Sequence, residues 1–166
     1  MFKNFYADAY FDKITDVSPS YLKEKGIRGI ILDIDNTLIG HNVPTPDENV
    51  LSHLRLFEAE GLKLCVVSNN EYDRVKNFAE KIKVEYFVHK ALKPRAYGYL
   101  LAAKEMNLSA NEIAAIGDQI FTDVWGARRA GCFAILTKPL HKGGEGFFIA
   151  FKRVLEKPFL RKRDKI

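Results

Sequence analysis

Short apolar runs alternate with segments of helical periodicity along most of this chain, and this alternation is the feature that most limits its possible folds. The apolar runs are GIRGIILDI, GLKLCVVS, VEYFVHK, EIAAIGD and CFAILTK. Their hydrophobic residues are largely consecutive, which is typical of parallel strands buried on both faces. The segments between them, such as DENVLSHLRLFEAE and EYDRVKNFAEKIK, repeat their apolar residues at the helical period. The sequence therefore predicts an α/β fold, a doubly wound, mostly parallel sheet of about five strands with helices on both faces.

Residues at the predicted helix ends agree with this arrangement. Asp47 is a suitable N-cap for the helix that follows it. Gly61 and Gly131 stand where helices should end before the next strand. Ser109 and Glu112 have the spacing of a capping box, which indicates a further helix start.

The length of 166 residues suits one domain with its own core. We expect that domain over residues 1–140, followed by a C-terminal aromatic and basic helix and tail over residues 141–166. No apolar run approaches the roughly 20 residues of a membrane span, and the N-terminus lacks the apolar region of a secretory signal. The two cysteines, Cys65 and Cys132, lie in apolar runs and are expected to be buried and reduced. These observations favour a cytoplasmic location.

Polar side chains follow four of the predicted strands. Along the chain these are Asp33 and Asp35, then Ser68, Asn69 and Asn70, then Lys93, and finally Asp118. In doubly wound sheets, ligands bind outside the carboxyl ends of the strands, near the point where the strand order reverses. The sequence therefore predicts that these four segments meet in one site.

The residue types in this set are suited to phosphoryl transfer. Asp33 and Asp35 are two residues apart, so in extended geometry their side chains lie on the same side. Their mutual repulsion would be relieved by Mg²⁺, which prefers oxygen ligands, and Asp118 can add a third carboxylate. One carboxylate can attack a phosphoryl group to form an aspartyl phosphate, while a second acid protonates the leaving oxygen and later activates water.

These segments resemble, in order, the four motifs of the haloacid dehalogenase (HAD) superfamily of phosphotransferases. DIDNTL is similar to the first motif, VVSNN to the second, ALKP to the third and GDQIFTD to the fourth. The resemblance covers roughly residues 26–140 and implies an HAD-like fold and activity. It implies that Asp33 is the nucleophile, Asp35 the acid and base, and Lys93 the lysine that tethers nucleophile and phosphate. An aspartate at the position of Asp35 is typical of the phosphatases of this superfamily.

The same resemblance implies further roles. The residues expected to contact the substrate phosphate are Thr37, Ser68, Asn69 and Lys93. The groups expected to hold Mg²⁺ are the side chain of Asp33, the backbone carbonyl of Asp35 and the side chain of Asp118. The residues expected in supporting positions are Asp123, Asn70 and Gln119.

Within the superfamily, longer segments are similar to subfamily IIIA, in the branch of YqeG and the phosphatidylglycerophosphate phosphatases. These segments are GIRGIILDIDNTLI, SNNEYDRV and GDQIFTDVWGARRAG. The resemblance implies hydrolysis of phosphatidylglycerophosphate to phosphatidylglycerol, a step of phospholipid biosynthesis. Two alternatives stay open: a phosphatase of a soluble sugar phosphate, nucleotide or nucleic-acid end, and a non-catalytic binding module on the same fold.

The spacing of the motifs leaves no room for a cap domain. Residues 38–67 and 70–93 each have room for little more than one helix and one strand. An uncapped site encloses a small metabolite poorly but admits a phosphate on a large carrier, such as a lipid head group. Alternatively, a neighbouring subunit covers the opening; the sequence does not indicate an oligomeric state.

The C-terminal segment bears on the nature of that carrier. Residues 152–166 hold seven basic residues against two acidic ones, next to several aromatic residues. This combination is typical of a segment that lies on an anionic membrane surface, here the inner face. The alternative is that the aromatic residues close the core and the basic end is solvated. Nucleic acid is not an expected partner, because the sequence shows no stacking platform or nucleic-acid motif.

Overall fold

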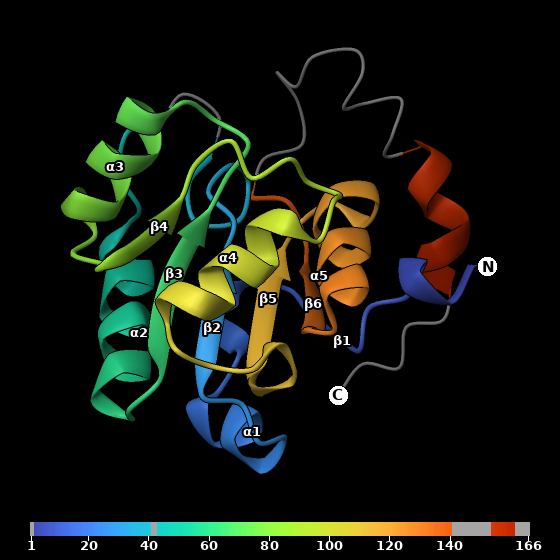
Figure 1. The fold of residues 1–166 in the computed structure, drawn as a ribbon, viewed down its shortest axis with the longest axis horizontal. Coiled ribbons are helices and arrows are strands. Elements are labelled where there is room, and N and C mark those ends of the chain that lie inside the picture. The colour runs from blue at the N-terminus through green and yellow to red at the C-terminus, as the bar shows by residue number, and fades with distance from the viewer. Residues whose placement is uncertain (1, 41–42, 141–153, 162–166) are drawn as a thin grey trace.

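A single parallel sheet of six strands organises the chain. The computed structural model describes residues 2–40, 43–140 and 154–161, and the statements below concern these residues. The strands are β1 (Ala9–Phe11), β2 (Gly29–Leu32), β3 (Lys63–Val67), β4 (Tyr86–Val88), β5 (Ile113–Gly117) and β6 (Phe133–Thr137). Their order is β1-β6-β5-β2-β3-β4, and all neighbours are parallel. The order reverses at β2, which pairs with both β3 and β5 (Figure 1). The predicted doubly wound fold is therefore confirmed.

The five predicted strands are β2 to β6, and the sixth, β1, was not expected from the sequence. It is only three residues long, and its run of apolar residues, AYF, is too short to indicate a strand. Its position depends on β6. The backbone N–H of Asp8 donates to the carbonyl of Ala134 at 2.8 Å, and the Asp8 carboxylate accepts from the N–H of Ala134 at 2.8 Å. Arg128 also pairs with Asp8 at 2.5 Å. These are long-range contacts, which a local pattern does not reveal.

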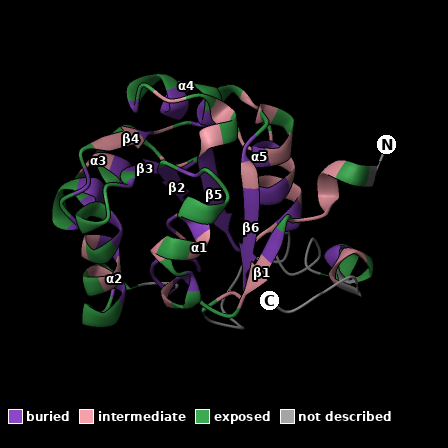
Figure 2. Cartoon of the chain, turned by 90° about the horizontal axis from the view of Figure 1, so that it is seen from below, coloured by how far each residue is buried: buried purple, intermediate pink, exposed green. Residues whose placement is uncertain are grey.

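Helices cover both faces of the sheet. They are α1 (Pro19–Glu24), α2 (Glu48–Ala59), α3 (Tyr72–Lys81), α4 (Tyr97–Glu105) and α5 (Trp125–Ala130). Short 3₁₀ turns are η1 (Phe2–Phe5), η2 (Ile14–Asp16), η3 (Ala110–Glu112) and η5 (Lys157–Arg161), and η4 (Ile120–Val124) is a π-helix. One core cluster joins α1, α2 and α3 to one face, and a second joins α4, α5 and η4 to the other. Figure 2 shows the buried strands between these helices.

Alternation along β2 separates the two clusters. Ile30 and Leu32 pack with the first cluster, whereas Ile31 packs with the second. Successive side chains of a strand point to opposite faces, so a strand covered on both sides needs apolar residues at consecutive positions. This is the physical reason for the consecutive apolar residues in the sequence.

Three of the predicted helix-end signals are present as expected, and the fourth differs in the helix type. The Asp47 carboxylate accepts from the N–H of Val50 at 2.9 Å and caps α2. Gly61 and Gly131 have φ of 81° and 86°, the left-handed conformation that glycine adopts without steric cost. The capping box of Ser109 and Glu112 is formed, but it begins the short turn η3.

Residues 154–161 of the C-terminal segment pack beside the N-terminal turn η1 (Figure 1). The rings of Phe5 and Phe159 have centroids 5.2 Å apart, and Leu160 also packs against the second core cluster. Glu156 is buried and accepts from the N–H of Phe121 at 3.0 Å. Phe159 and Leu160 therefore help to close the core. Residues 141–153 and 162–166, which carry most of the predicted membrane-binding segment, lie outside the described residues. Among the described helices, none has the length and apolar character needed to cross a membrane.

Asp8→Ala is expected to lower the free energy of unfolding by about 1 to 3 kcal/mol, because the buried N–H of Ala134 loses its side-chain acceptor. Urea unfolding measures the change. Asp12→Ala is the matched control: the Asp12–Lys138 pair is largely exposed and should contribute at most about 1 kcal/mol. Equal effects of the two substitutions would contradict the proposed anchoring of β1.

Candidate active site

The ends of β2, β3 and β5 bring the predicted polar residues to one edge of the sheet. The backbone N–H of Asp33 donates to the carbonyl of Ile116 at 3.1 Å and so extends the β2–β5 ladder by one residue. Ser68 directly follows β3, and Asp118 directly follows β5. Parallel strands place these three positions side by side.

A tight turn orients Asp33. Asn36 has a φ of 62°, a left-handed conformation that asparagine tolerates better than most residues, and its N–H donates to the carbonyl of Ile39 at 2.7 Å. The turn directs the buried Thr37 back toward the strand, where its hydroxyl donates to Oδ2 of Asp33 at 3.3 Å. The other carboxylate oxygen of Asp33 is left to face Lys93.

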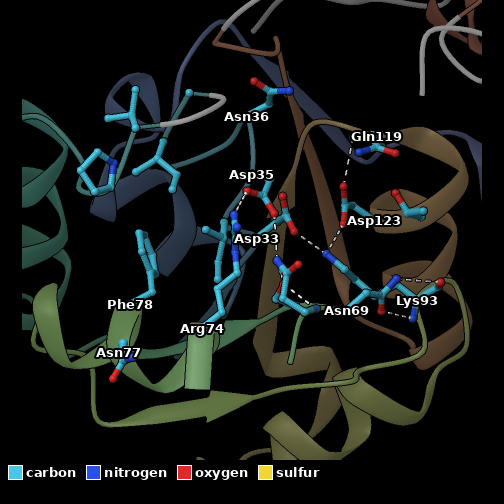
Figure 3. A pocket seen from close by; sticks show the side chains of 18 of the residues that line it. Asp33, Asp35, Asn36, Asn69, Arg74, Asn77, Phe78, Lys93, Gln119 and Asp123 are labelled. Atoms are coloured by element: carbon cyan, nitrogen blue, oxygen red, sulfur yellow. Dashed lines mark hydrogen bonds and ion pairs between the residues drawn. The ribbon is translucent and has the colours of Figure 1, made fainter. Parts of the chain in front are cut away.

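Lys93 joins two carboxylates. Its ammonium donates to Oδ1 of Asp33 at 2.5 Å and to Oδ1 of Asp123 at 2.7 Å (Figure 3). The Lys93 side chain is only 6% exposed. The Asn69 side chain holds the Lys93 backbone from both sides, because it accepts from its N–H at 2.8 Å and donates to its carbonyl at 3.3 Å. Asn69 therefore positions the lysine in this structure.

The π-helix η4 directs Asp123 back toward β5. Oδ2 of Asp123 accepts from the backbone N–H of Gln119 at 3.1 Å, and the hydroxyl of the buried Tyr99 donates to the Asp123 carbonyl at 3.2 Å. A Cβ at Gly117 would lie 2.4 Å from Cβ and Cγ of Asp123. Glycine is thus required at the end of β5 for this carboxylate to reach Lys93. π-helical turns often occur at functional sites.

Three carboxylates are arranged in a way that suits a hard cation. One oxygen each from Asp33, Asp118 and Asp123 lies within 4.8 Å of the others. With all three ionised and Lys93 protonated, the cluster carries an excess of two negative charges. An all-oxygen donor set with that excess fits Mg²⁺, which prefers carboxylates together with water and phosphate oxygens.

The pKa of Asp33 depends on burial and on the charges around it. Burial raises the pKa of Asp33 to about 7, Lys93 opposes the shift, and the charges of Asp123 and Asp35 add to it. For Lys93, burial lowers the pKa, but the carboxylates of Asp123 and Asp33 outweigh burial and raise it well above its ordinary value. Lys93 is therefore protonated, and a cation between the carboxylates would favour the ionised form of Asp33.

Asp35 has different partners from Asp33. Its Oδ2 accepts from the side-chain amide of Asn70 at 2.9 Å, and its Oδ1 pairs with Arg74 at 2.5 Å. The same amide of Asn70 also donates to the hydroxyl of Ser68 at 2.9 Å. The Asp35 side chain is 46% exposed, against 12% for Asp33. One carboxylate is thus enclosed beside Lys93, and the other is partly exposed to solvent.

A pocket of about 690 Å³ opens at this edge. One end is lined by Asp33, Asp35, Ser68, Asn69, Asn70, Lys93, Gln119 and Asp123. The other end is lined by α3 and by the loop that follows the turn. Thr37 and Asp118 are buried and are not part of the lining.

The structure brings the predicted site residues to one place, and their roles remain predictions. The sequence analysis missed Arg74, which contacts Asp35, and Tyr99, which supports η4. Helical periodicity could have shown which residues share a face with Arg74. It could not have shown that this face borders the pocket.

Comparisons with known proteins agree with the geometry. A sequence profile of the family described as mitochondrial PGP (phosphatidylglycerophosphate) phosphatase matches residues 4–141. The chain is similar to the probable phosphatase YqeG of Bacillus subtilis, with 35% identity over 95% of this chain and 91% of that protein. It is also similar to the chloroplastic and mitochondrial phosphatidylglycerophosphate phosphatase 1 of Arabidopsis thaliana, with 29% identity over 85% of this chain. The match spans 43% of the plant protein.

Solved structures share the fold at low sequence identity. A cobalt-bound deoxy-D-mannose-octulosonate 8-phosphate phosphatase of Haemophilus influenzae matches with a TM-score of 0.55 and 16% identity, over 84% of this chain and 90% of that one. An HAD superfamily (subfamily III A) hydrolase of Legionella pneumophila matches with a TM-score of 0.50 and 18% identity, over 86% of this chain and 87% of that one.

Asp118→Asn is expected to weaken Mg²⁺ binding by roughly tenfold or more, because the cluster loses the negative charge of one of its three carboxylates. Isothermal titration calorimetry with Mg²⁺ measures the affinity. Asp73→Asn, on the exposed first turn of α3, is the control and should bind like the unchanged protein. An unaltered affinity in Asp118→Asn would exclude this carboxylate as a ligand.

Proposed function

The chain belongs to the family of PGP phosphatases, within the HAD superfamily, and from this premise we propose that it hydrolyses the terminal phosphomonoester of phosphatidylglycerophosphate (PGP). The observation that carries the proposal is the Asp33 carboxylate, which is held by Lys93 and Thr37 at the wall of an open pocket. The family match and the similarity to a plant PGP phosphatase support the choice of substrate.

Asp33 is the proposed nucleophile. Its Oδ1 contacts Lys93 and its Oδ2 contacts Thr37, so the orientation of the carboxylate is set before substrate binds. In the first step a bond forms between Asp33 and phosphorus while the bond from phosphorus to the glycerol oxygen breaks. Lys93 lies beside Asp33 and would neutralise charge on the phosphoryl oxygens.

Asp35 is the proposed acid and base. In protonated form it would donate its proton to the departing glycerol oxygen, and it would then take a proton from the water that hydrolyses the aspartyl phosphate. Inorganic phosphate leaves and Asp33 is regenerated. The exposure of Asp35 gives water access to this side of the site, while Asn70 and Arg74 hold the carboxylate in place.

The side chains of Asp33 and Asp118 would hold Mg²⁺, together with the backbone carbonyl of Asp35. Asp123 would support the site by accepting a hydrogen bond from Lys93. When bound, Mg²⁺ would neutralise negative charge on the phosphate and on the carboxylates. Ser68 and Gln119 line the pocket and complete the proposed phosphate environment.

The open pocket supports a substrate that remains in a membrane. Among the described residues, only α2 lies between β2 and β3 as a helix, and only α3 lies between β3 and β4. No cap covers the site in this part of the chain, so a head group can enter while its acyl chains stay in the lipid. We propose peripheral contact with an anionic membrane, in which the basic residues beyond 160 take part.

Asp33→Asn is expected to reduce kcat by at least about 1,000-fold, because an amide cannot attack phosphorus to form the aspartyl phosphate. Release of inorganic phosphate from an aryl phosphate in the presence of Mg²⁺ measures kcat. The unfolding temperature should change by only a few degrees, since the amide oxygen can still accept from Lys93. Asp73→Asn again serves as the control. Retained turnover in Asp33→Asn would remove this residue from the mechanism.

The substrate proposal predicts that PGP in mixed detergent micelles is hydrolysed with a kcat/KM at least about tenfold above those of soluble sugar phosphates and nucleotides. The reason is that the open pocket gains binding energy from a large head group and gains little from a small metabolite. Phosphate release from each substrate at equal concentration provides the comparison. A soluble phosphate ester that is hydrolysed faster than PGP would contradict this assignment while leaving the phosphatase chemistry intact.

A further inference from the structure

The pocket continues beyond the catalytic residues along one face of α3. Arg74, Asn77, Phe78 and Lys81 all line it. Their spacing of three, four and seven residues places them on one side of the helix. Figure 3 shows Arg74 reaching from α3 toward Asp35, with Phe78 to its left on the same helix. A substrate that occupies the catalytic end can therefore extend along this helix.

This extension carries positive charge in addition to that of Lys93. Among the described residues Lys81 has no ion-pair partner, and Arg74 pairs with Asp35 through one of its nitrogens. The acidic residues Glu71 and Glu80 of the same region pair with Lys90 and Lys76. Neither acidic residue lines the pocket. The extension therefore has one cation at its distal end, Lys81, and a second, Arg74, that it shares with Asp35; both are suited to a second anion.

Apolar side chains also line this pocket. They are Ile39, Val43 and Pro44, together with Phe78, which lies between Arg74 and Lys81 on the helix. Arg74 and Lys81 are separated by about 10 Å along the helix axis, given a rise of about 1.5 Å per residue. The extension thus offers charge at two points and apolar residues in its lining.

We propose that Arg74 and Lys81 form a second anion subsite, which binds a phosphodiester one glycerol unit away from the phosphomonoester that is cleaved. This assignment rests on the proposed function and explains how the site selects its substrate. Arg74 borders both Asp35 and the distal end, so its remaining N–H donors face a molecule that spans the two. A phosphomonoester without a second phosphate leaves this subsite empty and binds more weakly.

The test compares two soluble substrates that share the glycerol phosphomonoester and differ in whether a glycerophosphoryl group, which supplies the phosphodiester, is attached to it. One is sn-glycerol 3-phosphate, and the other is glycerophosphoglycerol phosphate, the deacylated form of PGP. The unchanged protein should have a kcat/KM at least about tenfold higher for the second. Lys81→Ala should lower this preference about five- to tenfold, mainly through KM, because a charged contact to phosphate is lost. Lys76→Ala is the matched control on α3: Lys76 pairs with Glu80, does not line the pocket, and its loss should preserve the preference.

The results separate this subsite from the proposed substrate. The subsite proposal is wrong if Lys81→Ala leaves the ratio of the two kcat/KM values unchanged. An equal loss of kcat/KM on both substrates is such a result. A preference that arises only when vesicles of anionic lipid are added would also overturn the proposal, since the cations would then bind a neighbouring head group. If the preference depends on Lys81 but PGP in micelles is not hydrolysed, the subsite stands and PGP is the wrong substrate.

Discussion

The contact of Lys93 with Asp33 and Asp123 is the interaction on which the rest of the site depends. Buried carboxylates strongly favour a nearby positive charge, and the lysine supplies one charge to a cluster of three acids. The remaining negative charge suits a divalent cation and the phosphate that it would accompany. A buried, charged cluster of this kind is costly to assemble, so the surrounding structure has to hold each member in place.

That support comes from Tyr99 of the second core cluster and from Gly117 and Asn69. Gly117 ends β5 without a side chain, which leaves the space that Asp123 occupies. Tyr99 fills the core under η4 and donates to the Asp123 carbonyl, while Asn69 fixes the backbone of Lys93. The catalytic chemistry and the packing of the sheet are therefore coupled. Such support by neighbouring residues is the general requirement for holding charged groups in a productive geometry.

The fold class could be predicted from the sequence, because a strand that is buried on both faces must carry apolar residues at consecutive positions, as Ile30, Ile31 and Leu32 illustrate. The sixth strand, β1, was not predictable because its pairing depends on Asp8 and on β6, which lie about 125 residues apart. In the site, the acids stood out because a carboxylate after an apolar strand is uncommon without a function. Arg74 did not stand out, since an arginine on an amphipathic helix is ordinary.

The sequence by itself determined that five apolar runs become the strands β2 to β6 and which residues follow them. It also determined the class of chemistry that two closely spaced carboxylates, a lysine and a further acid can perform. These properties are local and follow from residue type and spacing. Only the tertiary structure decided that Asp33 is enclosed with Lys93 while Asp35 faces Arg74, and that one face of α3 extends the pocket. The charged partners of each carboxylate are side chains that are distant in the sequence. The packing of helices on the sheet decides which of these side chains come close enough to contact it.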